Sequence, residues 1–215
     1  CVICMYRIEV IWTIHCVLSN NSPSVLDVDS CQTTKIYKCM FKNGKARTGA
    51  ALKAYRSPNL LFSNNYFLNN TAMFFGGGVY AFHIQSLTFS NYHFEWNFVG
   101  TSGGAFYIDE GIFVRIWNVT VRNNQVKMSG GGIAIRLMKY SIILHVQIIG
   151  NHAMDQCGGI LVEKSEFKLV MYNSVISGNK AVASSGGLLG GASKVVQIVN
   201  CIVHGNQAAY RAGLD

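Results

Sequence analysis

The chain has 215 residues, of which half are hydrophobic and 13% are charged, and its formal net charge is +8. A disordered chain would be more highly charged and poorer in aromatic residues, so this composition excludes intrinsic disorder. The uncharged tract from Ser57 to Phe94 is long enough for a transmembrane helix, which needs about 18 or more apolar residues. Asn and Gly interrupt that tract throughout, and we therefore predict no membrane span within this segment.

The N-terminal part of the chain lacks a regular pattern. The first residues are apolar but are interrupted by Arg7, Glu9 and His15, and they lack the small-residue cleavage site of a signal peptide. We predict an irregular first coil or cap over residues 1–40. Because the chain does not begin with Met and its last coil stops just past Gly213, we expect a fragment with further coils or domains of its own chain beside it.

Cysteine usage gives no readable disulfide framework, because the seven cysteines are odd in number and irregular in spacing. Cys31 and Cys39 could pair, but buried free thiols are the expected state of most of them. Basic residues gather between Lys35 and Arg56, which hold seven of the 18 in the chain. We interpret this run as a solvated flank, since no aromatic platform is interleaved with it, and expect no nucleic-acid partner.

From residue 41 onward, asparagine recurs with a period of 27 residues, lengthened to 28 once. Each of these anchors follows an apolar residue by three positions: Asn43, Asn70, Asn97, Asn124, Asn151, Asn179 and Asn206. A glycine follows each of the last six by seven positions: Gly77, Gly104, Gly131, Gly158, Gly186 and Gly213. Between these turns apolar residues alternate with a period of two, as in Val79/Ala81 and Leu87/Phe89, which is strand periodicity.

A unit of short strands punctuated by Asn and Gly cannot bury its apolar face alone. Stacked units can, because each strand then pairs with its equivalent in the next coil at about 4.8 Å. The sequence therefore predicts an all-β fold, a parallel β-helix of about seven coils, forming a single domain over 1–215 with regular coils over 41–215. The anchors predict a stacked Asn ladder, and the glycine column implies either positive φ or no room for a Cβ atom.

A second polar column follows the anchors by 21 or 22 residues: Asn64, Asn91, Asn118, His145, Asn173 and Asn200. We predict a second interior ladder from it. Asn20, Asn69 and Asn118 match the N-glycosylation pattern, and the expected interior position of Asn118 argues against its use.

The pairing of these anchors with Gly-Gly-apolar turns is seen as "FLNN…GGGV", "FEWN…GGAF" and "VRNN…GGGI". It resembles the repeats of chlamydial-type polymorphic outer membrane proteins, members of the wider right-handed β-helix, pectin-lyase-like superfamily. The resemblance covers residues 41–215 well and residues 10–40 loosely. It implies a right-handed β-helix in an extracellular or cell-surface passenger that is used in adhesion.

Residues with catalytic potential are few in this chain, which has ten acidic residues. Asp27 and Asp29 share one strand face, but their expected partners in the next coil are Gly49 and Ala51, so no third carboxylate converges to bind Ca²⁺ or to form a catalytic cluster. The run from Gly100 to Gly104 matches a nucleophile elbow formally but lacks the strand-to-helix context. We predict no catalytic residue, no metal and no cofactor.

Two outward features remain as candidates for contact. Asp109, Arg136 and Glu163 occupy one position in three successive coils and predict an exposed cross-coil ion ladder. Tyr55, Tyr80, Phe82 and Tyr107 fall at outward positions of three adjacent coils, and exposed aromatic patches often mark a contact site. Their rings could stack on sugars, or could pack against a loop or a second domain.

These observations favour a non-enzymatic extracellular or cell-surface β-helix that presents a sheet for adhesion. The expected partner is a glycan or a cell-surface protein. The alternative is a carbohydrate-active enzyme, a polysaccharide lyase or glycoside hydrolase of the pectin-lyase-like fold.

Overall fold

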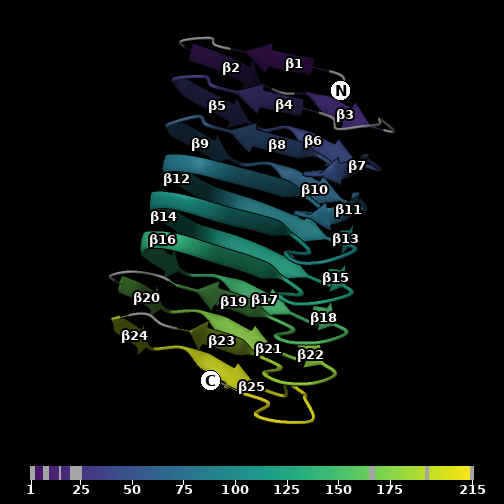
Figure 1. Cartoon of the computed structure of the whole chain (residues 1–215), viewed down its shortest axis with the longest axis vertical. Coiled ribbons are helices and arrows are strands. Elements are labelled where there is room, and N and C mark those ends of the chain that lie inside the picture. Colours follow the sequence, from purple (N-terminus) through teal and green to yellow (C-terminus); the bar gives the residue numbers. More distant parts are fainter. Residues whose placement is uncertain are drawn as a thin grey trace.

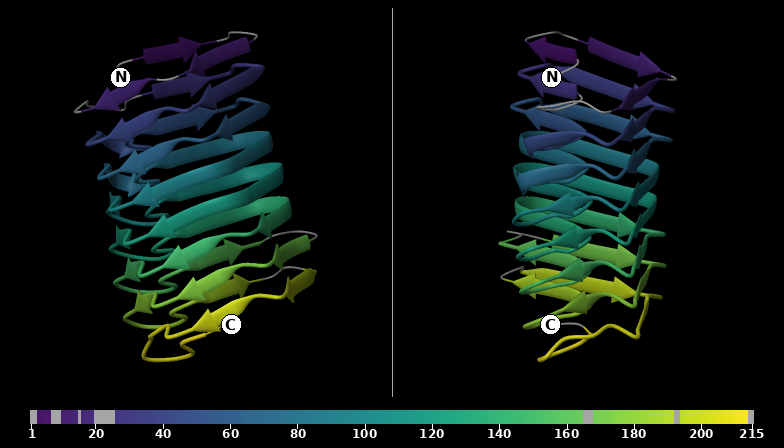
Figure 2. Two further views of the ribbon diagram at one scale, coloured as in Figure 1. Left: turned by 180° about the vertical axis from the view of Figure 1, so that it is seen from behind. Right: turned by 90° about the vertical axis from the view of Figure 1, so that its right-hand side faces the viewer.

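The structure is a computed structural model of the chain that describes residues 3–6, 10–14, 16–19, 26–164, 168–191 and 194–213. Every regular element in these ranges is a β-strand. Figure 1 shows the strands stacked as coils along one vertical axis, with the N-terminal strands at the top and the C-terminal strands at the bottom. The two further views in Figure 2 show the same stacking from behind and from the side.

Each coil passes through up to four strand positions, which we call faces one to four. Face one contains β1 (Ile3–Tyr6), β4 (Leu26–Asp29), β8 (Leu52–Tyr55), the starts of β12 (Val79–Glu95), β14 (Phe106–Arg122) and β16 (Ile133–Leu144), then β19 (Ile160–Glu163) and β23 (Leu188–Gly191). Face two contains β2 (Val10–Ile14), β5 (Thr33–Tyr37), β9 (Asn59–Ser63), the middles of β12 and β14, the end of β16, β20 (Lys168–Tyr172) and β24 (Val195–Val199).

Face three contains β3 (Val17–Ser19), β6 (Met40–Lys42), β10 (Tyr66–Leu68), the ends of β12 and β14, β17 (Gln147–Ile149), β21 (Val175–Ser177) and β25 (Ile202–His204). Face four is a separate narrow sheet made of β7 (Lys45–Thr48), β11 (Thr71–Phe75), β13 (Phe98–Val99), β15 (Gln125–Val126), β18 (His152–Ala153) and β22 (Lys180–Ala181). The long strands β12 and β14 run through three faces without a break in pairing, and this continuity makes the middle coils the most regular.

The strand register confirms the predicted period. Val79 pairs with Phe106 and Phe106 pairs with Ile133, each an offset of 27 residues, and every strand pair in the described part of the chain is parallel. The offset is 28 between β19 and β23, where Ile160 pairs with Leu188. The all-β parallel solenoid expected from the sequence is therefore confirmed. Strands β4 and β5, inside the segment that we expected to be irregular, pair in the same parallel manner.

Apolar side chains fill the inside of the coils because strand alternation directs every second residue inward. Phe67 stacks between Phe41 and Phe94, with ring centroids 4.8 and 4.6 Å away, and all three rings are buried. Like residues thus lie above like residues along the axis. The core extends as one column through the described coils.

The asparagine anchors form a buried ladder at the corner between faces three and four. Asn97 Nδ2 donates to Asn124 Oδ1 at 2.9 Å, and the same oxygen accepts the backbone N–H of Asn97 at 2.9 Å. Asn97 Nδ2 also donates to the carbonyl of Phe67 at 3.1 Å. The pattern repeats from Asn70 to Asn206 in the described coils. Each amide therefore satisfies polar groups that would otherwise be buried without partners.

Asn43 does not belong to this ladder, and its prediction as an anchor is wrong. The coil between β6 and β10 has 26 residues, since Phe41 pairs with Phe67. Gly44 therefore occupies the ladder position and donates its N–H to Asn70 Oδ1 at 2.9 Å. Asn43 lies one position earlier, has a φ of 55°, and accepts a hydrogen bond from Asn69 Nδ2.

The second polar column also faces the other way from its prediction. Asn64, Asn118, His145, Asn173 and Asn200 are exposed and Asn91 is half-buried. All of these residues have φ values between 49° and 59°, the left-handed region that asparagine tolerates better than most residues. The residue that follows each of them points inward instead, as the buried Asn65 does. Asn118 is consequently accessible, and the objection to its glycosylation pattern no longer holds.

The glycine column is explained by space and not by backbone conformation. A Cβ atom at Gly104 would lie 2.0 Å from the carbonyl oxygen of Gly131, and one at Gly77 would lie 2.4 Å from that of Gly104. Positive φ occurs one residue earlier, at Gly76 and Gly103. Gly213, at the end of the column, has no heavy atom within 4 Å of such a Cβ. Close stacking of successive turns therefore requires glycine at this position.

Candidate binding surface

The outer side of face one carries two columns of outward side chains that run along the axis. We call them together the face-one stripe. The first column contains Asp27, Lys53, Tyr80, Tyr107, Ala134, Leu161 and Leu189. The second contains Asp29, Tyr55, Phe82, Asp109, Arg136, Glu163 and Gly191. Along the axis the stripe changes from charged to aromatic and back to charged.

At its N-terminal end the stripe consists of ion pairs. Asp27 and Asp29 pair in register with Lys53 and Tyr55, so the expectation that Gly49 and Ala51 lie beside them is wrong. Lys53 Nζ lies 3.5 Å from Asp27 Oδ2, and Arg56 binds Asp29 with an N–O distance of 2.8 Å. The error arose because the β4 to β8 coil has 26 residues, while a shorter coil had been expected.

Asp29 is held in its charged form. Burial alone would raise the pKa of this carboxyl, but hydrogen bonds from Arg56 and Ser30 outweigh it, and the pKa lies below its usual value. The guanidinium of Arg56 also lies 4.6 Å from the centre of the Tyr55 ring. This cation–π contact connects the charged end of the stripe to its aromatic part.

The aromatic part is a set of nearly parallel rings. The Tyr55 and Phe82 centroids are 5.2 Å apart with planes inclined by 11°, and Tyr80 lies 6.4 Å from Phe82 at 4°. Tyr55, Tyr80 and Phe82 are half-buried, so part of each ring is available to solvent. Burial and the nearby Asp109 carboxylate raise the pKa of Tyr80 to about 12, so the hydroxyl stays protonated at neutral pH.

Tyr107 differs from the other three rings, and its prediction as an exposed aromatic is wrong. Its side chain is 2% exposed and packs against Phe75, whose ring centroid is 4.5 Å away. Phe75 ends β11 at the turn that leads into the next coil and covers the first column from the side. Tyr107 supports the Tyr80 ring, 5.9 Å away, from underneath.

Beyond the rings lies the ion ladder of Asp109, Arg136 and Glu163, which occupy paired positions in three successive strands. Arg136 approaches Asp109 Oδ2 to 3.5 Å and Glu163 Oε2 to 2.8 Å. It also donates to the hydroxyl of Tyr107 at 2.9 Å, and that hydroxyl lies 3.4 Å from Asp109 Oδ2. The structure thus brings the ladder and the aromatic cluster together, a junction that the sequence did not predict.

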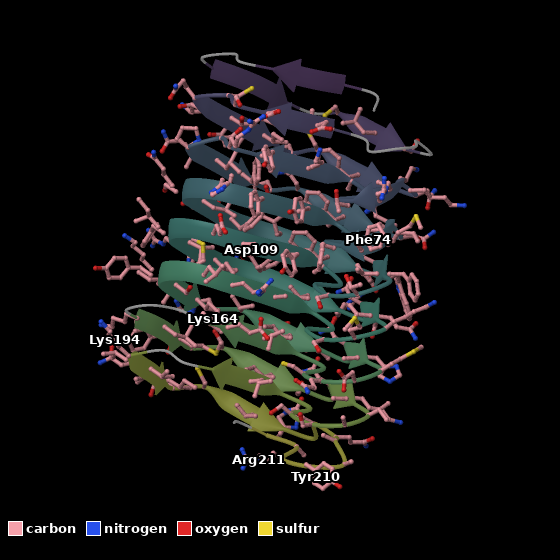
Figure 3. All side chains as sticks on the ribbon, in the orientation of Figure 1. Phe74, Asp109, Lys164, Lys194, Tyr210 and Arg211 are labelled. Atoms are coloured by element: carbon pink, nitrogen blue, oxygen red, sulfur yellow. The ribbon has the colours of Figure 1, made fainter. Side chains whose placement is uncertain are left out.

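Asp109 is the most enclosed carboxylate of the ladder, with 13% of its side chain exposed. Burial raises the pKa of this carboxyl above its usual value, although Arg136 opposes the shift. Its Oδ1 atom is buried and has no hydrogen-bond partner. In Figure 3 Asp109 lies nearer the N-terminal end of the solenoid than Lys164, which lines the last part of the stripe.

The stripe ends in a shallow hollow of about 370 Å³ lined by Arg136, Glu163, Lys164 and Gly191. The hollow exists because the ladder position that follows Glu163 is Gly191, which has no side chain to fill it. Rings, paired charges and an open end therefore lie in one line over adjacent coils. This arrangement can stack against a flat ligand and hydrogen-bond its edges.

A smaller hollow of about 200 Å³ lies on face three, where the Tyr66 and His93 rings stack at 4.9 Å beside the Glu95–Arg122 ion pair. Sequence reasoning missed this site. The 26-residue coil moved Tyr66 out of the column in which an outward aromatic could have been recognised.

Comparison with known proteins identifies the architecture. A family model described as a right handed beta helix region matches residues 8–137 and again residues 97–214. Comparison with curated proteins and with solved structures gave no match. The narrower resemblance to polymorphic outer membrane protein repeats stays a prediction. In the described part of the chain, no helix has both the length and the hydrophobicity needed to cross a bilayer.

Proposed function

The chain belongs to the family of right-handed β-helix regions, and from this premise we propose that its face-one stripe binds an extended neutral glycan. The protein would act as a non-enzymatic, extracellular or cell-surface β-helix in adhesion. The observation that carries the proposal is the row of half-buried, nearly parallel rings of Tyr55, Tyr80 and Phe82 on adjacent coils.

Ring geometry supports a sugar ligand. A sugar ring presents an apolar face that can pack on an aromatic side chain, and aromatic contacts contribute about 0.5–1.5 kcal/mol beyond the area they bury. The rings are held in place from below by Tyr107 and from the side by Phe75, so little side-chain entropy remains to be lost on binding. Because adjacent strands lie about 4.8 Å apart, successive rings offer a continuous platform along the axis.

The charge balance of the stripe supports a neutral ligand over a polyanion. Lys53, Arg56 and Arg136 each have an acidic partner within the stripe. A uronate polymer would have to break these pairs to gain a basic partner. The carboxylates of Asp29 and Glu163 can instead accept hydrogen bonds from sugar hydroxyls at the two ends of the platform.

Calorimetric titration with soluble neutral polysaccharides and with a polyuronate tests the proposal. We expect binding to a neutral polymer, and Tyr80→Ala and Phe82→Ala to weaken it about tenfold, equivalent to about 1.4 kcal/mol. Trp117→Ala is the matched control, since Trp117 is an exposed aromatic on face two. Unchanged affinity in both stripe variants, or binding to the polyuronate alone, would contradict the proposal.

A glycoside hydrolase is the second candidate, and one observation favours it. The raised pKa of Asp109 suits a general acid, and the more exposed Glu163 lies on the other side of Arg136. Reducing-sugar release from the polymers that bind would separate the two functions. Cleavage that Asp109→Asn abolishes while affinity is kept would replace binding by hydrolysis. Asp27→Asn, at the other end of the stripe, is the control.

A further inference from the structure

Two cysteines far from the stripe lie opposite one another on adjacent coils. Val17 of β3 pairs in register with Met40 of β6, and the N–H of Met40 donates to the carbonyl of Cys16 at 2.8 Å. Cys16 and Cys39, the residues just before this pair, are therefore cross-coil neighbours. Neighbouring strands lie about 4.8 Å apart, which falls within the Cα separation of about 4.4–6.8 Å that a disulfide needs.

The two sulfur atoms face each other. Cys16 Sγ and Cys39 Sγ are 2.6 Å apart, although the residues are 23 positions apart in the sequence. A bonded pair has an S–S length of about 2.05 Å, so bond formation requires a movement of only about half an ångström. The sequence had suggested Cys31 as a partner for Cys39, but Cys31 Sγ points to the carbonyl of Asp29 at 3.4 Å.

A hollow gives access to the pair. It has a volume of about 440 Å³ and is lined by Cys16, Lys38, Cys39, Met40 and Tyr66, among others. Cys16 is half-buried, whereas Cys39 is 1% exposed. A small disulfide can therefore reach Cys16 first, and Cys39 can follow from inside.

We propose that Cys16 and Cys39 are an oxidation site that forms a disulfide staple between adjacent coils. The Cys16 thiolate attacks one sulfur of a low-molecular-weight disulfide such as oxidised glutathione, forming a mixed disulfide and releasing one thiolate. The Cys39 thiolate then attacks the Cys16 sulfur, releases the second thiol and leaves the Cys16–Cys39 bond. Two protein thiols are oxidised and one small disulfide is reduced to two thiols, with the two protein protons passing to the released thiolates.

The staple would act on the terminal coil of the described stack. It ties the start of β3 to the start of β6 and so limits the conformations open to the chain between them when the protein unfolds. Burial and the hydrogen bond to Cys39 raise the pKa of the Cys16 thiol to about 12. The exchange is consequently expected to quicken as pH rises, because only the thiolate reacts.

The test is incubation of the whole chain in a buffer of oxidised and reduced glutathione, followed by alkylation under denaturing conditions and peptide mass mapping. We expect a peptide pair joined through Cys16 and Cys39 with Cys31 alkylated, and a melting temperature higher by about 5 °C than that of the reduced protein. Full alkylation of both Cys16 and Cys39 after incubation would overturn the proposal.

Variants keep the test independent of folding losses. Cys16→Ser should abolish the cross-link and the redox-dependent melting shift. Cys201→Ser is the matched control, because Cys201 is also half-buried but its Sγ faces the carbonyl of Val199, and it should leave both unchanged. A melting shift that persists in Cys16→Ser would assign the effect to another cysteine and refute the site. Glycan binding is not involved in either readout.

Discussion

The buried asparagine ladder and the outward asparagine column use the same residue type at the same period but in opposite environments. Asn124, in the ladder, is 1% exposed, and its side chain bonds to Asn97 and Asn151 and to main-chain carbonyls. Asn118, in the outward column, is exposed, has a φ of 51° and donates to Asn91. One column satisfies buried polar groups, and the other permits a corner of the backbone. The same side chain therefore serves hydrogen bonding in one place and conformation in the other.

The largest effect should come from removing one rung of the ladder. Asn124→Ala leaves the N–H of Asn97 and the amide of Asn151 without their buried partner, and each such group costs about 1–3 kcal/mol. We expect a loss of about 3 kcal/mol or more in the free energy of unfolding, measured by urea titration.

The matched change in the outward column should cost less. Asn118→Ala should lose about 1 kcal/mol, the price of a Cβ-bearing residue in the left-handed region, while Asn118→Gly should stay near the wild type. Equal losses for Asn124→Ala and Asn118→Ala would refute the difference between the columns.

A smaller loss is expected from the glycines that let the inner column stack closely. Gly104→Ala places a Cβ atom 2.0 Å from the carbonyl of Gly131, and overpacking of this kind costs about 1–3 kcal/mol. Gly213→Ala is the control, because its Cβ would have no neighbour within 4 Å. Melting temperatures of the two variants give the comparison, and a comparable drop in both would show that backbone crowding is not the cause.

The smallest effects concern titration, which belongs to the outer side of the wall because the ladder amides carry no charge. The pKa of Asp29 is lowered below 3.8 in the folded protein, so its contribution to stability is present above that value and is lost as pH falls through the folded pKa. Asp29→Asn should therefore destabilise at neutral pH, by less than about 1 kcal/mol, and lose its effect in acid.

Asp109 should show the opposite sign. Its folded pKa is raised above 3.8, so its contribution is present below that value and is lost as pH rises through the folded pKa. The stability of Asp109→Asn relative to the wild type should accordingly improve as pH rises across this range. Thermal unfolding from about pH 3 to about pH 7 measures both variants, and changes of the same sign would contradict the assignment.

Repetition made much of the fold predictable. A period of 27 residues with apolar alternation between turns leaves stacked parallel strands as the way to bury the apolar side, and the register agrees with this from β8 to β17. The positions of Asp109, Arg136 and Glu163 in one column followed from the same count. Where the period changed, the count failed: the 26-residue coils displaced Asn43 from the ladder and gave Asp27 and Asp29 different partners.

The candidate surface was less predictable, because a period does not describe what covers a strand. Tyr55, Tyr80 and Phe82 lie on the outer side as alternation requires. Tyr107 follows the same alternation but is buried, since Phe75 from the preceding turn packs over it. The facing sulfurs of Cys16 and Cys39 were likewise hidden, because the coil that joins them is shorter than the repeat.

The sequence by itself determined the repeat, the parallel all-β solenoid and the identity of the stacked columns, because hydrophobic burial and strand pairing act on every coil in the same way. The tertiary structure decided which way each polar column faces. A residue with positive φ turns the chain at each corner, so that Asn64 points to solvent and Asn65 points to the core. That one-residue difference in direction depends on how each coil rests on the next, and no periodic count of residue types contains it.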